Sequence, residues 1–135
     1  MRYLLLLFFT CCFSFLHAQK SPDPPTDTTV KKSSKKPKIL FGVASYYADK
    51  FNGRETANGE IYDSRKMTAA CNVLPLGTWI RVTNLVNNRS VVVKTNDRMH
   101  IRMKRVVDLS RAAAEKLGYI GRGLTKVKVE VLEKK

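Results

Sequence analysis

The chain has 135 residues, enough for one small domain, and its 25 Lys and Arg against 11 Asp and Glu give a formal net charge of +14. Such an excess favours a polyanionic partner: nucleic acid, acidic lipid or an anionic cell-wall polymer. Three cysteines and two histidines show no ligand spacing and there is no glycine-rich phosphate loop, so neither a metal nor another cofactor is expected.

Residues 1–18 have the pattern of a secretory signal peptide. Arg2 precedes an apolar run over 4–16, and Ala18 supplies the small residue before a cleavage point. The run is short for a membrane span, which takes about 20 apolar residues, although an uncleaved anchor is an alternative. Lipidation at Cys11 or Cys12, which would make the mature protein a lipoprotein, is a second alternative. We therefore expect an exported protein of the periplasm or cell envelope, either soluble or a lipoprotein. Its contact with the membrane is expected only through the signal peptide or a lipid at one of these cysteines. Nucleic acid is not an expected partner.

Residues 19–38 are predicted to be a disordered basic linker, because they hold four of the five prolines, are rich in lysine and contain no aromatic residue. This segment either holds the domain near an anionic surface or is a solvated spacer. Cleavage after Ala18 leaves Cys71 as the one cysteine, so no intramolecular disulfide is expected.

Residues 39–135 are predicted to form the domain. Segments with strand patterns are, in chain order, 41–48, 78–86, 90–95, 106–107 and 124–132. Residues 49–63 read as a loop, and Asn87-Asn88 as a hairpin turn. A helix is predicted over 111–117, capped by Ser110 and ended by Gly118. About six short strands and one or two short helices indicate a mainly β protein. We expect a closed barrel, because closure removes exposed strand edges.

Three stretches carry a family resemblance: GVASYYADKFNGRETANGEIYD, MTAACNVLPLGTWIRVTNLVNNRSVVVKTNDR and VVDLSRAAAEKLGYIGRGLTKVKVEVL. In this order and spacing they resemble the rare lipoprotein A family, the septal lytic transglycosylases. The resemblance implies a six-stranded double-psi β-barrel with a groove for peptidoglycan glycan strands. It also implies an enzyme that cleaves the MurNAc–GlcNAc bond with a 1,6-anhydro product in cell-wall remodelling. A non-catalytic, expansin-like module that binds peptidoglycan or another polysaccharide is the alternative.

The resemblance also implies catalytic carboxyls at Asp97, in NDR, and Glu60, in TANGE. One carboxyl can protonate the leaving oxygen and then accept the proton of the sugar's own 6-hydroxyl. From the residues alone, an aspartate beside a cation is more often an ion pair, although alternation along the strand would separate Asp97 from Arg98. Cys71 stands where the family has a histidine, which puts activity in doubt, and His100 is a candidate substitute.

Candidate substrate-binding residues are Tyr46, Tyr47, Thr56, Asn58, Asn96 and Arg98. Because neighbours on a strand point to opposite sides, we expect one of Tyr46 and Tyr47 to face the groove, and one of Trp79 and Ile80 to point inward. Asp108 is assigned a structural role, capping the helix or tying a loop. The expected partners are peptidoglycan glycan strands and, in addition, cell-division or envelope proteins, and the protein is expected to be a monomer.

Overall fold

The computed structural model describes residues 36–132. The predicted signal peptide, most of the predicted linker and residues 133–135 lie outside the described residues, so those expectations stay predictions. β1 (Ile39–Tyr46) begins at the first residue of the predicted domain. Within the described part, no helix has the length and apolar character that crossing a membrane requires.

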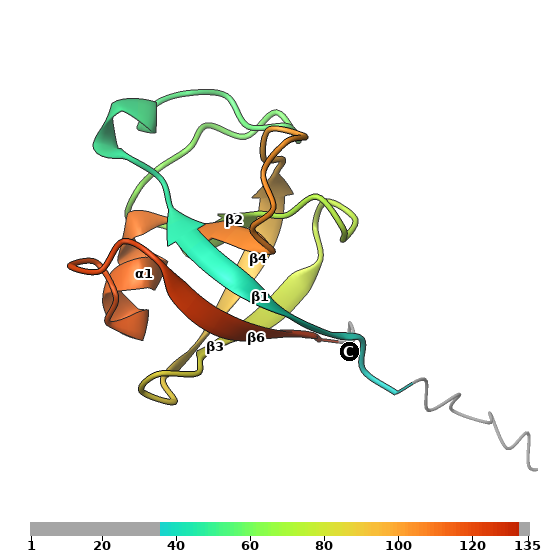
Figure 1. The fold of residues 1–135 in the computed structure, drawn as a ribbon. Helices are drawn as coiled ribbons and strands as arrows, with labels where there is room; N and C mark the ends of the chain where they lie inside the picture. The colour runs from blue at the N-terminus through green and yellow to red at the C-terminus, as the bar shows by residue number, and fades with distance from the viewer. Residues whose placement is uncertain (1–35, 133–135) are drawn as a thin grey trace, which may run out of the picture. The chain divides into compact units, whose positions relative to one another are not determined.

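Six strands close into a barrel (Figure 1). The others are β2 (Thr68–Ala70), β3 (Trp79–Asn84), β4 (Ser90–Asp97), β5 (Val107–Leu109) and β6 (Thr125–Val131). Their order around the barrel is β1-β5-β2-β4-β3-β6. β1 runs parallel to β5 and β2 parallel to β4, and the remaining neighbours are antiparallel. The predicted mainly β, closed six-stranded barrel is therefore confirmed.

The barrel interior is filled by alternate residues of the strands, as the sequence pattern predicts for the longer ones. The fully buried side chains of this set are Ala44, Ile80, Val82, Val93, Val107, Leu109, Val127 and Val129. Ile80 points inward, so its neighbour Trp79 lies on the outer face and is 44% exposed. The alternation is interrupted at the end of β4, where a register shift opposite Ala69 and Ala70 puts Ala70 against Asp97.

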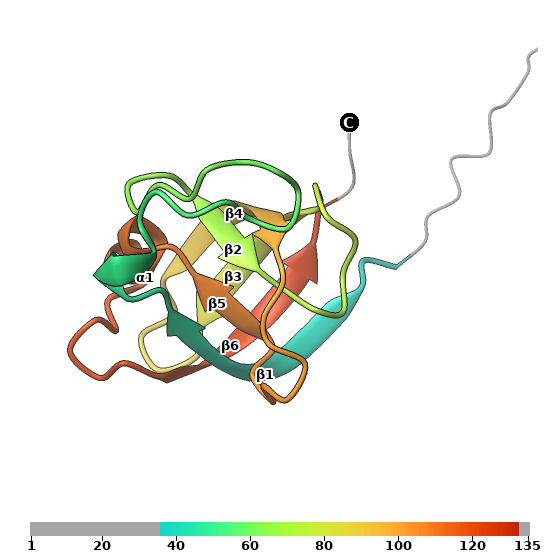
Figure 2. The ribbon, with the colours of Figure 1, turned by 90° about the horizontal axis from the view of Figure 1, so that it is seen from above.

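The helix α1 (Arg111–Leu117) lies beside the barrel (Figure 2) and has the predicted ends. The Ser110 hydroxyl accepts a hydrogen bond from the Ala113 N–H, and Gly118 ends the helix with a φ of 75°, a left-handed conformation that glycine adopts without strain. Ala113, Ala114 and Leu117 are buried against the core. A short 3-10 turn, η1 (Asp49–Phe51), follows β1.

Gly42 on β1 is required by a close contact. A Cβ at this position would lie 2.8 Å from the Val106 Cβ, closer than two carbon atoms can pack. Gly42→Ala is expected to destabilise the domain by about 1–3 kcal/mol, the range for overpacking a tight site. Gly121→Ala is the control, because a Cβ there meets nothing within 4 Å. Urea unfolding of both variants checks the expectation, and equal stabilities would contradict it.

Tyr119 couples the stability of the barrel to pH. Its ring is 1% exposed and its hydroxyl donates to the Ser45 carbonyl at 2.8 Å. Burial, with smaller contributions from Asp108 and Tyr46, raises the pKa of Tyr119 above its ordinary value of 10.0. The unfolded chain therefore ionises first, and the stability from this group is lost as pH rises above about 10, by at most about 1.4 kcal/mol per pH unit.

Tyr119→Phe is accordingly expected to lower stability at neutral pH, by about 1 kcal/mol for the lost hydrogen bond, and to flatten the decline at alkaline pH. Urea unfolding of the wild type and the variant, from neutral pH to about pH 11, measures both effects. Parallel alkaline declines in the two proteins would show that Tyr119 does not carry this pH dependence.

Candidate functional site

Asp97 is the last residue of β4 and its carboxylate is held by three hydrogen bonds. Its Oδ1 accepts the backbone N–H groups of Ala57 at 2.9 Å and Arg98 at 2.8 Å, and its Oδ2 accepts the Tyr47 hydroxyl at 2.6 Å. A carboxylate oxygen has two acceptor positions. Among the described residues Oδ1 is thus fully used, whereas Oδ2 keeps one position for a further partner. Oδ2 is the oxygen best placed to exchange a proton.

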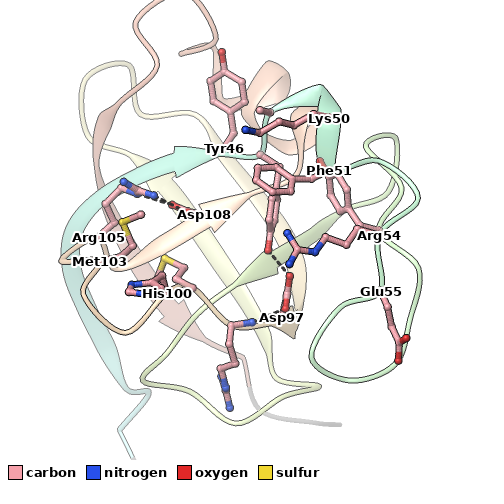
Figure 3. Close-up of a pocket in the computed structure, with 15 residues that line it drawn as sticks. Tyr46, Lys50, Phe51, Arg54, Glu55, Asp97, His100, Met103, Arg105 and Asp108 are labelled. Carbon is pink, nitrogen blue, oxygen red and sulfur yellow. Dashed lines mark hydrogen bonds and ion pairs between the residues drawn. The ribbon is translucent and has the colours of Figure 1, made fainter.

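The carboxylate lies in a pocket of about 730 Å³ (Figure 3). The pocket is lined by Tyr46, Tyr47, Ala48, Lys50, Phe51, Arg54, Glu55, Tyr62, Asp97, Arg98, Met99, His100, Met103, Arg105 and Asp108. Aromatic rings and methionines provide apolar contact area. The lining also contains four Lys and Arg residues and three Asp and Glu residues, so positive groups outnumber negative ones by one. Such a lining suits a ligand with apolar ring faces, hydroxyls and a negative group.

Tyr47 is fixed by the rings around it. Its centroid lies 4.6 Å from that of Tyr62 and 5.9 Å from that of Phe51, in a tilted and a T-shaped arrangement. Burial first, and then the hydrogen bond to Asp97, raise the pKa of Tyr47 well above its ordinary range. The phenol therefore stays protonated at neutral pH and remains a donor to the Asp97 carboxylate.

Arg98 does not neutralise Asp97. Its guanidinium Nη1 instead donates to the backbone carbonyls of Cys71 and Leu74, the latter at 2.6 Å. Across residues 36–132 no cation forms an ion pair with Asp97 within 4.0 Å. The ion pair that the residues alone favour is therefore not formed, and the separation expected from strand alternation is observed.

Tyr46 and Tyr47 both contribute to the pocket lining, but their side chains point in different directions, as expected for neighbours at the end of a strand (Figure 3). Tyr46 packs against the core, with its ring 5.9 Å from that of Tyr119. Tyr46 donates its hydroxyl to the Ile120 carbonyl at 3.0 Å. Tyr47 turns to Asp97 instead.

Glu60 lies outside this pocket. Its Oε2 accepts from the Asn96 side chain at 2.9 Å, and its Oε1 lies 3.7 Å from the Lys94 Nζ. Hydrogen bonds from Asn96 and then Asn58 lower the pKa of Glu60, so it is an anion at neutral pH. Glu60 is thus held beside β4 by Asn96 and Lys94, whereas Asp97 lines the pocket.

The other loop residues of the TANGE motif are used to shape the loop. Thr56, which is buried, donates its hydroxyl to the Asn58 side-chain oxygen at 2.7 Å. Asn58 also accepts from the Glu60 N–H and donates its own N–H to the Asn96 carbonyl. None of Thr56, Asn58 and Asn96 lines the pocket, so their predicted contact with substrate stays a prediction.

Cys71 follows β2 and is fully buried in the core, beside the site but not in its lining. Its N–H donates to the Asp97 carbonyl at 3.1 Å. A thiol in the core offers no ionisable group to the pocket. His100 does line the pocket, on an exposed loop, with its Nδ1 accepting the Arg102 N–H at 3.2 Å. Their predicted auxiliary roles stay predictions.

The sequence reasoning missed the far wall of the pocket. Asp108 forms a bidentate ion pair with Arg105, at 2.7 and 2.9 Å, and both line the pocket (Figure 3). Asp108 thus ties a loop, as predicted, but does not cap α1, whose cap is Ser110. The sequence also does not identify Lys50, Phe51 and Arg54 as pocket residues, because a loop without periodicity does not show which of its side chains point toward a pocket. Within residues 36–132 no group of three His, Cys, Asp or Glu is placed to hold a metal ion.

Comparisons with known proteins agree with this picture. A family model described as lytic transglycolase matches residues 40–129. The endolytic peptidoglycan transglycosylase RlpA of Haemophilus influenzae is 48% identical over 107 residues, which cover 79% of this chain and 37% of that protein. The protein of the same name from Pseudomonas aeruginosa is 53% identical over 94 residues, covering 70% and 28%. The chain therefore spans about a third of the length of these relatives.

Two solved structures show the fold at low identity. The Streptomyces papain inhibitor is 23% identical with a TM-score of 0.59, over 71% of this chain and 96% of that chain. The Clavibacter michiganensis expansin is 18% identical with a TM-score of 0.59, over 73% and 52%. The family match, by contrast, extends over nearly all of the described residues. The chain therefore belongs to the lytic transglycolase family, and its domain is a double-psi β-barrel of the rare lipoprotein A type.

Proposed function

We propose that the domain is a peptidoglycan lytic transglycosylase that cleaves the MurNAc–GlcNAc bond of glycan strands in cell-wall remodelling. The observation that carries the proposal is Asp97, which presents one free acceptor position of Oδ2 beside the Tyr47 hydroxyl in the pocket. The relatives named as endolytic peptidoglycan transglycosylases support the same substrate and reaction.

The reaction is proposed to use Asp97 twice. Protonated at Oδ2, it donates its proton to the glycosidic oxygen as the bond from that oxygen to the muramyl C1 breaks, which releases the leaving sugar as an alcohol. The carboxylate then takes the proton of the 6-hydroxyl of the same muramyl residue while O6 bonds to C1. No water is consumed, and Asp97 ends in its starting state.

The neighbours of Asp97 are assigned supporting roles. The Tyr47 hydroxyl and the Ala57 and Arg98 N–H groups stabilise the carboxylate that forms when Asp97 gives up its proton. The rings and methionines of the lining supply the apolar surface for the sugars. Lys50 and Arg54 on the pocket wall attract the lactyl carboxylate of muramic acid.

Incubation of the purified protein with glycan strands that lack stem peptides tests this proposal. Mass spectrometry is expected to find products that end in 1,6-anhydro-muramic acid. Reducing-end products, heavier by one water, would instead indicate a hydrolase. A correctly folded protein that releases no fragment at all would overturn the enzymatic assignment.

A non-catalytic module that binds peptidoglycan is the second candidate. It is favoured by the burial of Cys71 in the core, so that the residue standing where the family has a histidine does not reach the pocket. This candidate predicts binding to sacculi without release of soluble fragments. For either function, we propose that the protein acts in the periplasm or cell envelope, where its substrate lies.

A further inference from the structure

The outer face of β3 and β4 carries a row of side chains that the pocket does not use. Trp79 lies in this row, 44% exposed, and it is the single tryptophan of the chain. Lys94 is its partner on β4, and Arg81 and Val92 form the next pair along the ladder. Thr83 and Ser90, the pair after that, are joined through their hydroxyl oxygens at 2.8 Å.

The ladder pattern brings Trp79 and Lys94 close together. The Lys94 N–H donates to the Met67 carbonyl at 3.1 Å and the Trp79 carbonyl accepts the Leu132 N–H at 2.9 Å, so both residues bond to other neighbours and form a non-hydrogen-bonded pair. Side chains of such pairs approach most closely. Trp79 is 44% exposed, and within residues 36–132 no aromatic ring or cation is recorded against its indole.

The charges of the row favour an anionic ligand. Glu130 faces Arg81 from β6, but its carboxylate pairs with Lys128 at 3.3 Å, and Arg81 has no ion pair within 4.0 Å among the described residues. Lys94 has one long contact, 3.7 Å, to Glu60. An aromatic plane flanked by a free guanidinium and a weakly paired ammonium suits a ring with an apolar face and a carboxylate.

The row adjoins the pocket through one loop. The loop over residues 55–61 donates the Ala57 N–H to Asp97 on one side and contacts Lys94 and Asn96 through Glu60 on the other. A strand bound along the outer face would therefore pass next to the segment that holds Asp97. This gives Glu60, which the pocket leaves out, a place in a site.

We propose that Trp79, Arg81, Lys94 and Glu60 form a second glycan-binding site, in which the Trp79 indole stacks on a sugar ring and Arg81 and Lys94 attract a muramyl carboxylate. The site holds the glycan strand outside the pocket while Asp97 acts on another part of it. The inference rests on the proposed function for its substrate class.

Trp79 reports on its own occupancy because no other tryptophan contributes to the emission. The protein with Asp97→Asn, which cannot consume the ligand, is titrated with glycan strands free of stem peptides and, separately, with neutral N-acetylglucosamine oligomers. The expected result is a saturable change in tryptophan emission, reached at lower concentrations with the muramyl strands. Added salt should weaken only the binding of the anionic strands.

Calorimetric binding to the same strands supplies the mutational test. Trp79→Ala is expected to weaken binding about tenfold, as for a central aromatic contact. Arg81→Gln should reduce the preference for muramyl strands over neutral oligomers, since Lys94 and the cations of the pocket remain. Phe41→Ala is the matched control, because Phe41 is an exposed aromatic on the outer face of β1, 68% exposed and separated from β3 by β6.

The outcomes separate this site from the proposed reaction. If strands bind with no change in emission and no effect of Trp79→Ala, the second site is overturned whether or not the wild type cleaves them. If emission and Trp79→Ala respond as expected while the wild type releases no anhydro product, the site stands and the transglycosylase proposal fails. Equal effects of Trp79→Ala and Phe41→Ala would also overturn the site.

Discussion

Asp97→Asn is expected to lower the release of anhydro products by about 10³-fold or more, while binding to glycan strands is retained. Asparagine has the shape of aspartate, so its side-chain oxygen can still accept the Ala57 and Arg98 N–H groups. The amide, however, neither donates a proton to a leaving oxygen nor accepts one from the sugar hydroxyl. Binding and bond cleavage should therefore separate in this one variant.

The measurement is the initial rate of anhydro-product formation by mass spectrometry, with binding to sacculi followed by cosedimentation. Glu115→Gln is the matched control, because Glu115 is an exposed carboxylate on α1 that pairs with Arg111, outside the pocket. Thermal unfolding by circular dichroism establishes that both variants are folded. Cleavage by Asp97→Asn at a rate close to that of the wild type would remove Asp97 from the chemistry.

Long, regular elements could be predicted from the sequence because their signals are local. Val127 and Val129 alternate with polar residues along β6, and the Ser110 and Gly118 signals fix both ends of α1. β2, however, was missed. Its three residues, Thr68–Ala70, are all buried between β4 and β5, so the segment lacks the alternation of buried and exposed positions by which a strand is recognised. Only the closed barrel makes this segment a strand.

The candidate site was partly predictable for the same reason. The NDR resemblance singles out Asp97, but its contact with Tyr47 joins residues 50 positions apart and depends on how the loop after β1 returns over β4. The guanidinium of Arg98 is drawn away by two backbone carbonyls that no sequence pattern identifies. Glu60, by contrast, carries the motif but faces the outer side of β4. Motifs locate the residues, and chain closure decides which of them meet.

Tyr47→Phe is expected to reduce kcat by about 10- to 100-fold with a small change in KM. The phenol donates a 2.6 Å hydrogen bond to Oδ2, the oxygen assigned the proton transfers, and a hydrogen bond to a charged group contributes about 1.5–3 kcal/mol. Without this donor the carboxylate that forms during proton donation is less stable. The pH–rate profile should accordingly move to higher pH.

Tyr46→Phe is the control, because it removes a tyrosine hydroxyl near the pocket without removing the hydrogen bond to Asp97. Tyr46 also lines the pocket, but its hydroxyl donates to the Ile120 carbonyl and does not contact Asp97. Its removal should leave the pH–rate profile in place, whatever it does to KM. Because phenylalanine keeps the ring packing of Tyr47 against Phe51 and Tyr62, a shifted profile in Tyr47→Phe reports on the hydroxyl itself. A lowered kcat with an unshifted pH–rate profile in Tyr47→Phe would contradict the assigned role. It would indicate that Tyr47 contacts the substrate and does not assist proton transfer by Asp97.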